Sequence, residues 1–170
     1  MLWLMGSPYR WIFSGDNMSK EWNDLVKRMP TLLKQLTSQP LRPWNDWGIL
    51  PQRGVYVFYE DEKPMYVGRT NNMSRRLNQH GNPSSGHTSA TFAFNIAKRE
   101  AIKKGMNVRL TRSQLEVDPA FSKLYLEAKV RVSKMPVRVI EINDPIVQTL
   151  FEVYAAMCLD TREYNDFDTH

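Results

Sequence analysis

A glutamate inside an apolar segment near the end of the 170-residue chain is the sharpest chemical signal in this sequence. Glu152 stands among residues 146–159, which are nearly all apolar and therefore predict a helix that is buried on most sides. A buried carboxylate must be paired, protonated or bound to a metal ion, because an isolated buried charge is too costly. The alternative is a position at the rim of the fold, where Glu152 reaches water or pairs with an arginine.

A basic cluster in the middle of the chain is a candidate phosphate site. Arg76 and His80 are four residues apart, so they share one face of a predicted helix. Arg69 lies just before that helix, whose free N–H groups also favour an anion. Guanidinium groups in this arrangement can hold a phosphate through bidentate contacts, whereas a solvated basic face is the commoner fate of such a run. The candidate nucleic-acid-binding residues are Arg69, Arg75, Arg76, Lys98 and Arg99.

Two tyrosines precede this cluster, one in each of two predicted strands. Residues 54–59 and 64–68 are rich in β-branched and aromatic side chains, and the polar residues between them predict a hairpin. Tyr56 lies in the first strand and Tyr66 in the second. Tyrosines in a hairpin usually pack across the strands, but Gly68 also permits close backbone approach to a ligand.

Capping signals predict the helices that follow the hairpin. A helix capped by Thr70 or Asn71 runs to about His80, and a second covers residues 91–104. Asp-Pro pairs at 118–119 and 144–145 open two further helices, on either side of a strand at residues 136–142. The predicted order is β-β-α-α-α-β-α. It gives an α+β domain at residues 52–170, with a small antiparallel three-stranded sheet flanked by helices.

Residues 1–51 predict a small N-terminal helical extension and linker. Ser19 caps a helix that Pro30 ends or kinks, and a second short helix follows over residues 32–36. The next stretch, residues 38–52, is rich in proline and predicts an extended arm packed by Trp44 and Trp47.

Composition narrows the class of partner and the setting. The net charge of +5 favours an anionic partner, and nucleic acid is the commonest one. The single cysteine, Cys158, excludes an intrachain disulfide and a cysteine-based zinc site, and it favours a cytoplasmic location, with the thiol buried in the apolar segment. No apolar stretch reaches the roughly 18 residues that span a bilayer, so no membrane partner is expected. His87 and His170 are predicted to be exposed rather than metal ligands.

The ordered set of these residues resembles one known pattern, that of the GIY-YIG nucleases. The tripeptides at residues 54–56 and 66–68, Gly-Val-Tyr and Tyr-Val-Gly, are similar to the two signature tripeptides of that family, with valine in place of isoleucine in both. Arg76 matches the family's arginine on the first helix, and Glu152 matches its metal-binding glutamate. Asn165, in a Tyr-Asn pair, matches the supporting asparagine near the end of the domain. The stretch between the first helix and the glutamate is longer than in the smallest members.

The resemblance implies a metal-dependent endonuclease that hydrolyses phosphodiester bonds in DNA. Glu152 would hold one divalent cation, Mg²⁺ or Mn²⁺. Tyr56 would activate the water, with its pKa lowered by Arg69, Arg76 and the cation, and with His80 beside it. Alternatively, Tyr66 contacts the nucleophile while Tyr56 only orients it. The implied catalytic residues are Tyr56, Tyr66, Arg69, Arg76, His80 and Glu152, supported by Gly54, Gly68 and Asn165.

Two other functions stay open at this stage. The same fold with its chemistry unused would be a binding module for nucleic acid or a protein, and Mg²⁺-dependent nicking of a plasmid separates the two. A partner-binding subunit would depend most on residues 19–50. The sequence leaves open DNA against RNA, the specificity of cleavage and the oligomeric state.

Overall fold

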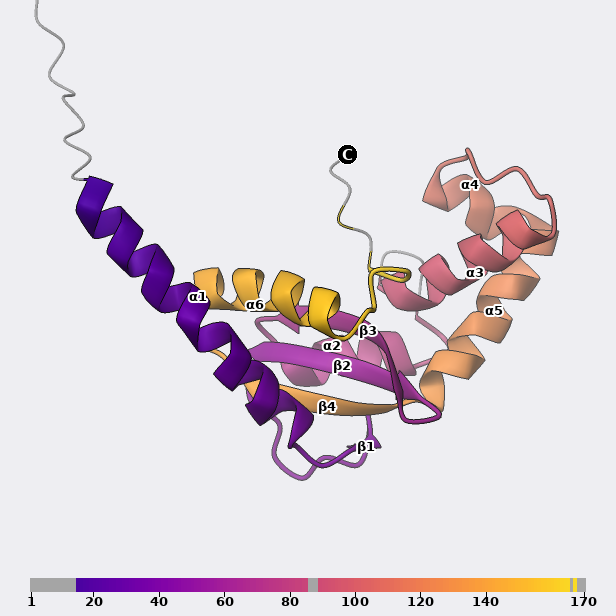
Figure 1. Ribbon diagram of the computed structural model, residues 1–170. Coiled ribbons are helices and arrows are strands. Elements are labelled where there is room, and N and C mark those ends of the chain that lie inside the picture. The colour runs from indigo at the N-terminus through magenta and orange to yellow at the C-terminus, as the bar shows by residue number, and fades with distance from the viewer. Residues whose placement is uncertain (1–14, 86–88, 166, 168–170) are drawn as a thin grey trace, which may run out of the picture.

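A four-stranded antiparallel sheet lies at the centre of the computed structural model, which describes residues 15–85, 89–165 and 167 (Figure 1). Its strand order is β1-β4-β2-β3, with bounds β1 Arg42–Pro43, β4 Pro136–Glu141, β2 Gly54–Glu60 and β3 Lys63–Thr70. The α+β class is confirmed, but the prediction of three strands was one short. The additional strand, β1, pairs only two residues with β4, which is too short to produce a periodic pattern in the sequence.

The hairpin of β2 and β3 is tighter than predicted. Glu60 pairs with Lys63, so only Asp61 and Glu62 form the turn, and both have positive φ angles, 48° and 64°. This is the backbone that a two-residue hairpin favours, because its twist matches that of the flanking strands. β2 lies between β3 and β4, so nearly all of its residues are buried.

Six helices occur in the part of the chain that the structure describes. Their bounds are α1 Gly15–Thr37, α2 Met73–Gly81, α3 Thr91–Lys103, α4 Arg112–Val117, α5 Pro119–Ser133 and α6 Pro145–Cys158. Asp118 and Asp144 cap α5 and α6 through their side chains, as the Asp-Pro pairs predicted. The cap of α2 is Asn72 instead of Thr70 or Asn71. The short helix α4 was not predicted, and its capping box joins Thr111 to Gln114.

The N-terminal segment forms one long helix, so the prediction of two helices separated at Pro30 was wrong. α1 continues through Pro30, and Ser19 lies inside the helix rather than at its cap. Proline removes one backbone hydrogen bond, but Met29 and Leu36 are buried beside it against the sheet and α6. Packing of this apolar face stabilises the helix more than the proline disrupts it.

Helices cover both faces of the sheet. Side chains alternate along β2, so Tyr56 and Phe58 face α2, α3 and α5, whereas Val55 and Val57 face α1 and α6. In Figure 1, α3, α4 and α5 stand together at one end of the sheet, and α1 extends past the other end. Each face therefore has its own apolar core.

The segment between α1 and β2 is anchored by aromatic side chains. The Trp44 indole donates to the carbonyl of Ser133 at 3.0 Å and packs against Gly81, and Trp47 packs on the same core. Cys158, predicted to be buried, is exposed at the end of α6. Within the described ranges, no helix is both long and apolar enough to cross a bilayer.

Candidate active site

The hydroxyl of Tyr56 is the centre of a buried hydrogen-bonded group. The Nε of Arg76 donates to this hydroxyl oxygen at 3.1 Å, and Nε2 of His80 lies 2.9 Å from it. Tyr56 and His80 have no exposed surface. Since Arg76 can only donate, the phenol proton is free to point at Nε2 of His80. The proton of a neutral His80 is then on Nδ1, which is buried and has no hydrogen-bond partner among the described residues.

Local structure explains why these three side chains meet. Arg76 and His80 share one face of α2, which starts three residues after β3 ends. Tyr56 pairs with Gly68 across the hairpin. A Cβ atom at Gly68 would lie 2.9 Å from Cε2 of Tyr56 and still closer to its Cζ and hydroxyl, so only glycine leaves room for the ring. Gly54 is constrained in the same way, because a Cβ there would overlap the carbonyl of Ile140.

Tyr66 lies beside this group and closer to the surface. Its ring centroid is 6.4 Å from that of Tyr56 and 5.6 Å from that of His80. It stacks on Phe92 of α3 at 4.7 Å with an interplanar angle of 12°. Tyr66 is 8% exposed, whereas Tyr56 is not exposed at all. Phe92 was not predicted as a site residue, since one more aromatic residue on a helix carries no signal of its own.

Arg69 and Glu152 form an ion pair at the edge of the sheet. The Nε of Arg69 on β3 donates to Oε2 of Glu152 on α6 at 2.9 Å. The two side chains are 44% and 20% exposed, so Glu152 lies at the rim of the fold and pairs with an arginine. Burial raises the pKa of the Glu152 carboxyl, and the charges of Arg69 and Arg76 act against that rise.

Burial also controls the titration of the tyrosines and the histidine. It raises the pKa of Tyr56 well above its ordinary value of 10, and the nearby Arg76 lowers it by less. Arg76 thus acts in the expected direction, but desolvation of a fully buried phenol outweighs one guanidinium. Burial lowers the pKa of His80 well below 6.5, and the Arg76 charge adds to this effect. His80 is thus neutral and can accept a hydrogen bond.

Asn165 fastens the open edge of β3. Its Oδ1 accepts from the N–H of Val67 at 3.1 Å, and its Nδ2 donates to the carbonyl of Val67 at 2.6 Å. Thr161 donates to the same Oδ1 at 3.0 Å. The amide therefore replaces a neighbouring strand for Val67, directly beside Tyr66. This arrangement positions the hairpin, and Thr161 is a partner that the sequence did not indicate.

The residues of this site offer a single carboxylate for a metal ion. Among the residues described, no three His, Cys, Asp or Glu side chains gather in one place. One carboxylate suits Mg²⁺, which keeps several waters and commonly binds through one or two carboxylates together with substrate phosphates. Glu152 fits that role, with its Oε2 shared at present with Arg69.

Not all the predicted residues come together. Tyr56, Tyr66, Arg76 and His80 form one cluster, and the charge of Glu152 acts on both tyrosines. Arg75 is exposed on α2. Lys98 and Arg99 lie apart from this cluster and line a hollow beside the segment that follows α6. His87 and His170 lie outside the described residues.

Residues 52–130 match the family model of the GIY-YIG catalytic domain. The match includes the hairpin and α2, with both tyrosines, Arg76 and His80, and it ends before Glu152 and Asn165. No curated protein and no solved structure matches the chain.

Proposed function

Through residues 52–130 this chain belongs to the GIY-YIG family, and from that premise we propose that it is a divalent-metal-dependent endonuclease that hydrolyses phosphodiester bonds in DNA. The observation that carries the proposal is the hydrogen-bonded group of Arg76, Tyr56 and His80, beside a carboxylate on another element. A fold needs no such group for stability, because burying it leaves Nδ1 of His80 without a hydrogen-bond partner in the part of the chain that the structure describes. Buried, imperfectly satisfied polar clusters are characteristic of reactive sites.

Arg76 binds the scissile phosphate in this proposal. In the protein without ligands its guanidinium contacts Tyr56, the side chain of Gln79 at 3.3 Å and the carbonyl of Ser89 at 3.0 Å. These are neutral acceptors, which an anionic phosphate oxygen can replace with a stronger, charge-assisted bond. The same bond strengthens as negative charge builds on the phosphate in the transition state.

Tyr56 and His80 move the proton of the attacking water. The raised pKa of Tyr56 means that no phenolate is present at neutral pH, so the phenol acts as a relay. Its oxygen accepts a proton from water while its own proton passes to Nε2 of His80, 2.9 Å away. Atoms and charge balance: the hydroxide adds to phosphorus, the bond to the leaving oxygen breaks, and His80 carries one proton. Departure of Arg76 toward the phosphate frees the Tyr56 oxygen for the water.

Tyr66 is the alternative contact to the nucleophile. It is closer to the surface than Tyr56 and lies within ring contact of His80. In that arrangement Tyr56 only orients the group. The pH profiles of cleavage by Tyr56→Phe and Tyr66→Phe distinguish the two arrangements. Removal of the tyrosine that relays the proton abolishes the pH dependence that comes from this proton transfer. Removal of the tyrosine that only orients the group lowers the rate at every pH.

Glu152 would hold the cation, and Arg69 would hold Glu152 in place. When bound, Mg²⁺ or Mn²⁺ would neutralise charge on the phosphate and stabilise the leaving oxygen. Arg69 limits the rotation of the carboxylate through its 2.9 Å bond. Preference for DNA over RNA and a cytoplasmic location are predictions from the sequence that belong to this proposal.

Cleavage of supercoiled plasmid tests the proposal. The full chain is incubated with Mg²⁺, Mn²⁺ or EDTA, beside Glu152→Gln, Arg76→Ala and the control Lys27→Ala, whose side chain is exposed on α1. We expect cleavage by the wild type and the control in the presence of metal, and none by the two site variants. Equal behaviour of all four folded proteins would refute the proposal and favour a catalytically silent GIY-YIG-fold binding module.

A further inference from the structure

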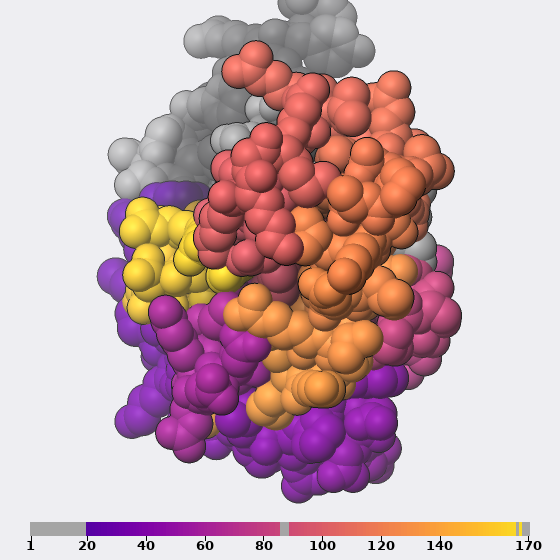
Figure 2. All heavy atoms as spheres, turned by 90° about the vertical axis from the view of Figure 1, so that its right-hand side faces the viewer, coloured from indigo at the N-terminus to yellow at the C-terminus, as the bar shows by residue number. Residues whose placement is uncertain are grey.

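A hollow lies outside the tyrosine cluster, between α3 and the segment that follows α6. It has a volume of about 500 Å³, and we call it the α3 groove. Its lining includes Lys98, Arg99, Ile102, Arg162, Tyr164 and Phe167. In Figure 2 the yellow atoms of the C-terminal segment lie beside the red atoms of α3 on one face of the molecule.

The spacing of residues on α3 creates one wall of this groove. Asn95, Lys98 and Ile102 recur at intervals of three and four, so they share the face of α3 that points away from the core. Ile102 is 54% exposed and adds an apolar side chain to this wall. Asn95 ties this wall to the other by donating to the carbonyl of Tyr164 at 2.9 Å.

Three cations and two aromatic rings meet in the groove. Among the described residues that line it, Lys98, Arg99 and Arg162 are cations and Glu163 alone is acidic. The guanidinium carbon of Arg99 lies 5.3 Å from the ring centre of Tyr164, a cation–π contact. Phe167 is 45% exposed. Sites for single-stranded nucleic acid combine cations that contact the phosphate backbone with aromatic rings that stack on the bases.

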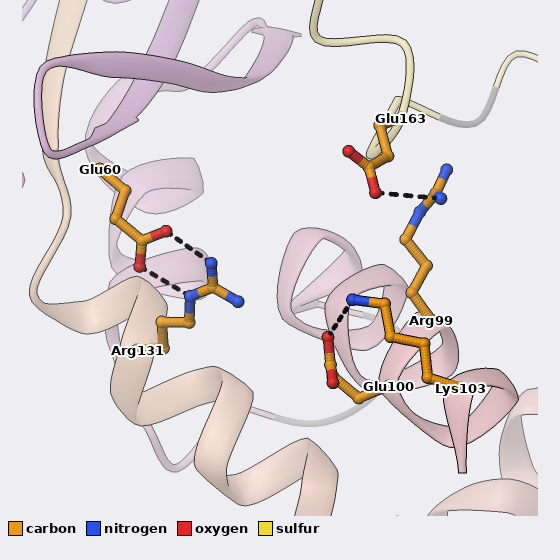
Figure 3. A network of polar contacts seen from close by, with 6 residues as sticks. All are labelled: Glu60, Arg99, Glu100, Lys103, Arg131 and Glu163. Atoms are coloured by element: carbon orange, nitrogen blue, oxygen red, sulfur yellow. Dashed lines mark hydrogen bonds and ion pairs between the residues drawn. The ribbon is translucent and has the colours of Figure 1, made fainter.

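The pair of Arg99 and Glu163 is weak enough to exchange. Figure 3 shows Arg99 reaching from α3 toward Glu163 on the C-terminal segment, at an N–O distance of 3.3 Å. The side chains are 39% and 55% exposed, so water screens the pair and its stabilisation is small. A phosphate can take the place of the Glu163 carboxylate on Arg99.

Ring contacts join the groove to the candidate active site. Tyr66 stacks on Phe92 at 4.7 Å, and Phe92 meets Tyr164 edge to face at 5.8 Å. Asn165, which holds the edge of β3 at Val67, also lines the groove. One aromatic ring, that of Phe92, thus separates Tyr66 from the groove residue Tyr164.

We propose that the α3 groove binds a single-stranded stretch of nucleic acid next to the cleavage site, through phosphate contacts of Lys98, Arg99 and Arg162 and base contacts of Phe167 and Tyr164. The proposal rests on the proposed function and specifies the substrate further. It predicts a preference for DNA that has a single-stranded segment beside the duplex to be cut.

Binding in EDTA tests the groove separately from catalysis. The affinity of the full chain for a fluorescein-labelled single-stranded oligonucleotide is measured by anisotropy over a range of salt concentrations. Lys98→Gln with Arg162→Gln is compared with Lys27→Gln and Arg28→Gln on α1, which carry the same loss of charge elsewhere. We expect the groove pair to reduce the slope of log Kd against log salt by roughly 1.4, because each phosphate contact to a single strand contributes about 0.7. The α1 pair should leave the slope unchanged.

Two single variants keep the test independent of folding. Glu163→Gln should tighten binding, an effect that a loss of structure cannot produce. Phe167→Ala, which removes an exposed side chain, should weaken binding by about fivefold if one base stacks there. Equal slopes for the two double variants, or no tightening by Glu163→Gln, would overturn the groove proposal. If these expectations hold but plasmid is not cleaved, the groove proposal stands and the nuclease proposal fails. If plasmid is cleaved but all variants bind the oligonucleotide like the wild type, the nuclease proposal stands and the groove proposal fails.

Discussion

Replacement of Gly68 by alanine tests whether the hairpin sets the position of Tyr56. The added Cβ would lie 2.9 Å from Cε2 of Tyr56 and closer to two further atoms, whereas ordinary contact begins near 3.4 Å. The ring must therefore move by roughly 1 Å, and it is fully buried and hydrogen-bonded to Arg76 and His80. A misplacement of about 1 Å at a reacting group costs on the order of 100-fold in rate. Overpacking should cost about 1–3 kcal/mol in the free energy of unfolding.

The assay is the rate of Mg²⁺-dependent plasmid nicking, measured with the melting temperature of each protein. A change of 1 kcal/mol moves the melting temperature by about 2–4 °C in a chain of this size. Gly48→Ala is the matched control, because a Cβ there meets nothing within 4 Å. If Gly68→Ala nicks within about threefold of the wild type and melts at the same temperature, the argument that Gly68 positions Tyr56 is incorrect.

Three further predictions follow. Glu152→Gln should lower the rate of metal-dependent cleavage by at least about 100-fold. It should change the free energy of unfolding by less than about 1 kcal/mol, because the pair of Glu152 with Arg69 is partly exposed. A large loss of stability in a chemical denaturation curve would contradict this. The pKa of His80 is lowered in the folded protein, so below pH 6.5 the unfolded chain binds a proton that the folded one does not. The free energy of unfolding should therefore fall as the pH falls from 6.5 toward the folded pKa, by up to about 1.4 kcal/mol per pH unit. If this is wrong, the difference in unfolding free energy between the wild type and His80→Gln should not change with pH. Asn165→Ala leaves the N–H and carbonyl of Val67 without their partner and should cost about 1–3 kcal/mol, whereas the exposed Asn143→Ala should melt like the wild type.

Local signals in the sequence were sufficient for most of the elements. The hairpin, the strand at residues 136–142 and the helices opened by Asp118 and Asp144 depend on contacts within a few residues, which a linear pattern records. Pro30 shows the limit of such signals. A local rule ends a helix there, but the helix continues because its apolar face packs on a sheet formed by residues much later in the chain. The strand β1 is likewise set by its partner β4 and has no pattern of its own.

The candidate site divides in the same way. Local patterns predicted the candidate residues and the elements that carry them: two tyrosines in paired strands, Arg76 and His80 one turn apart, and a carboxylate in a late apolar helix. Contacts between distant residues depend on the folded chain: Arg69 pairs with Glu152, 83 residues away, and Asn165 replaces a strand at the edge of β3. Arg76 lowers the pKa of Tyr56, as the sequence predicted, but burial raises this pKa by more. Charges of neighbours are visible in a sequence, but desolvation depends on how completely the folded chain excludes water, and that is a property of packing alone.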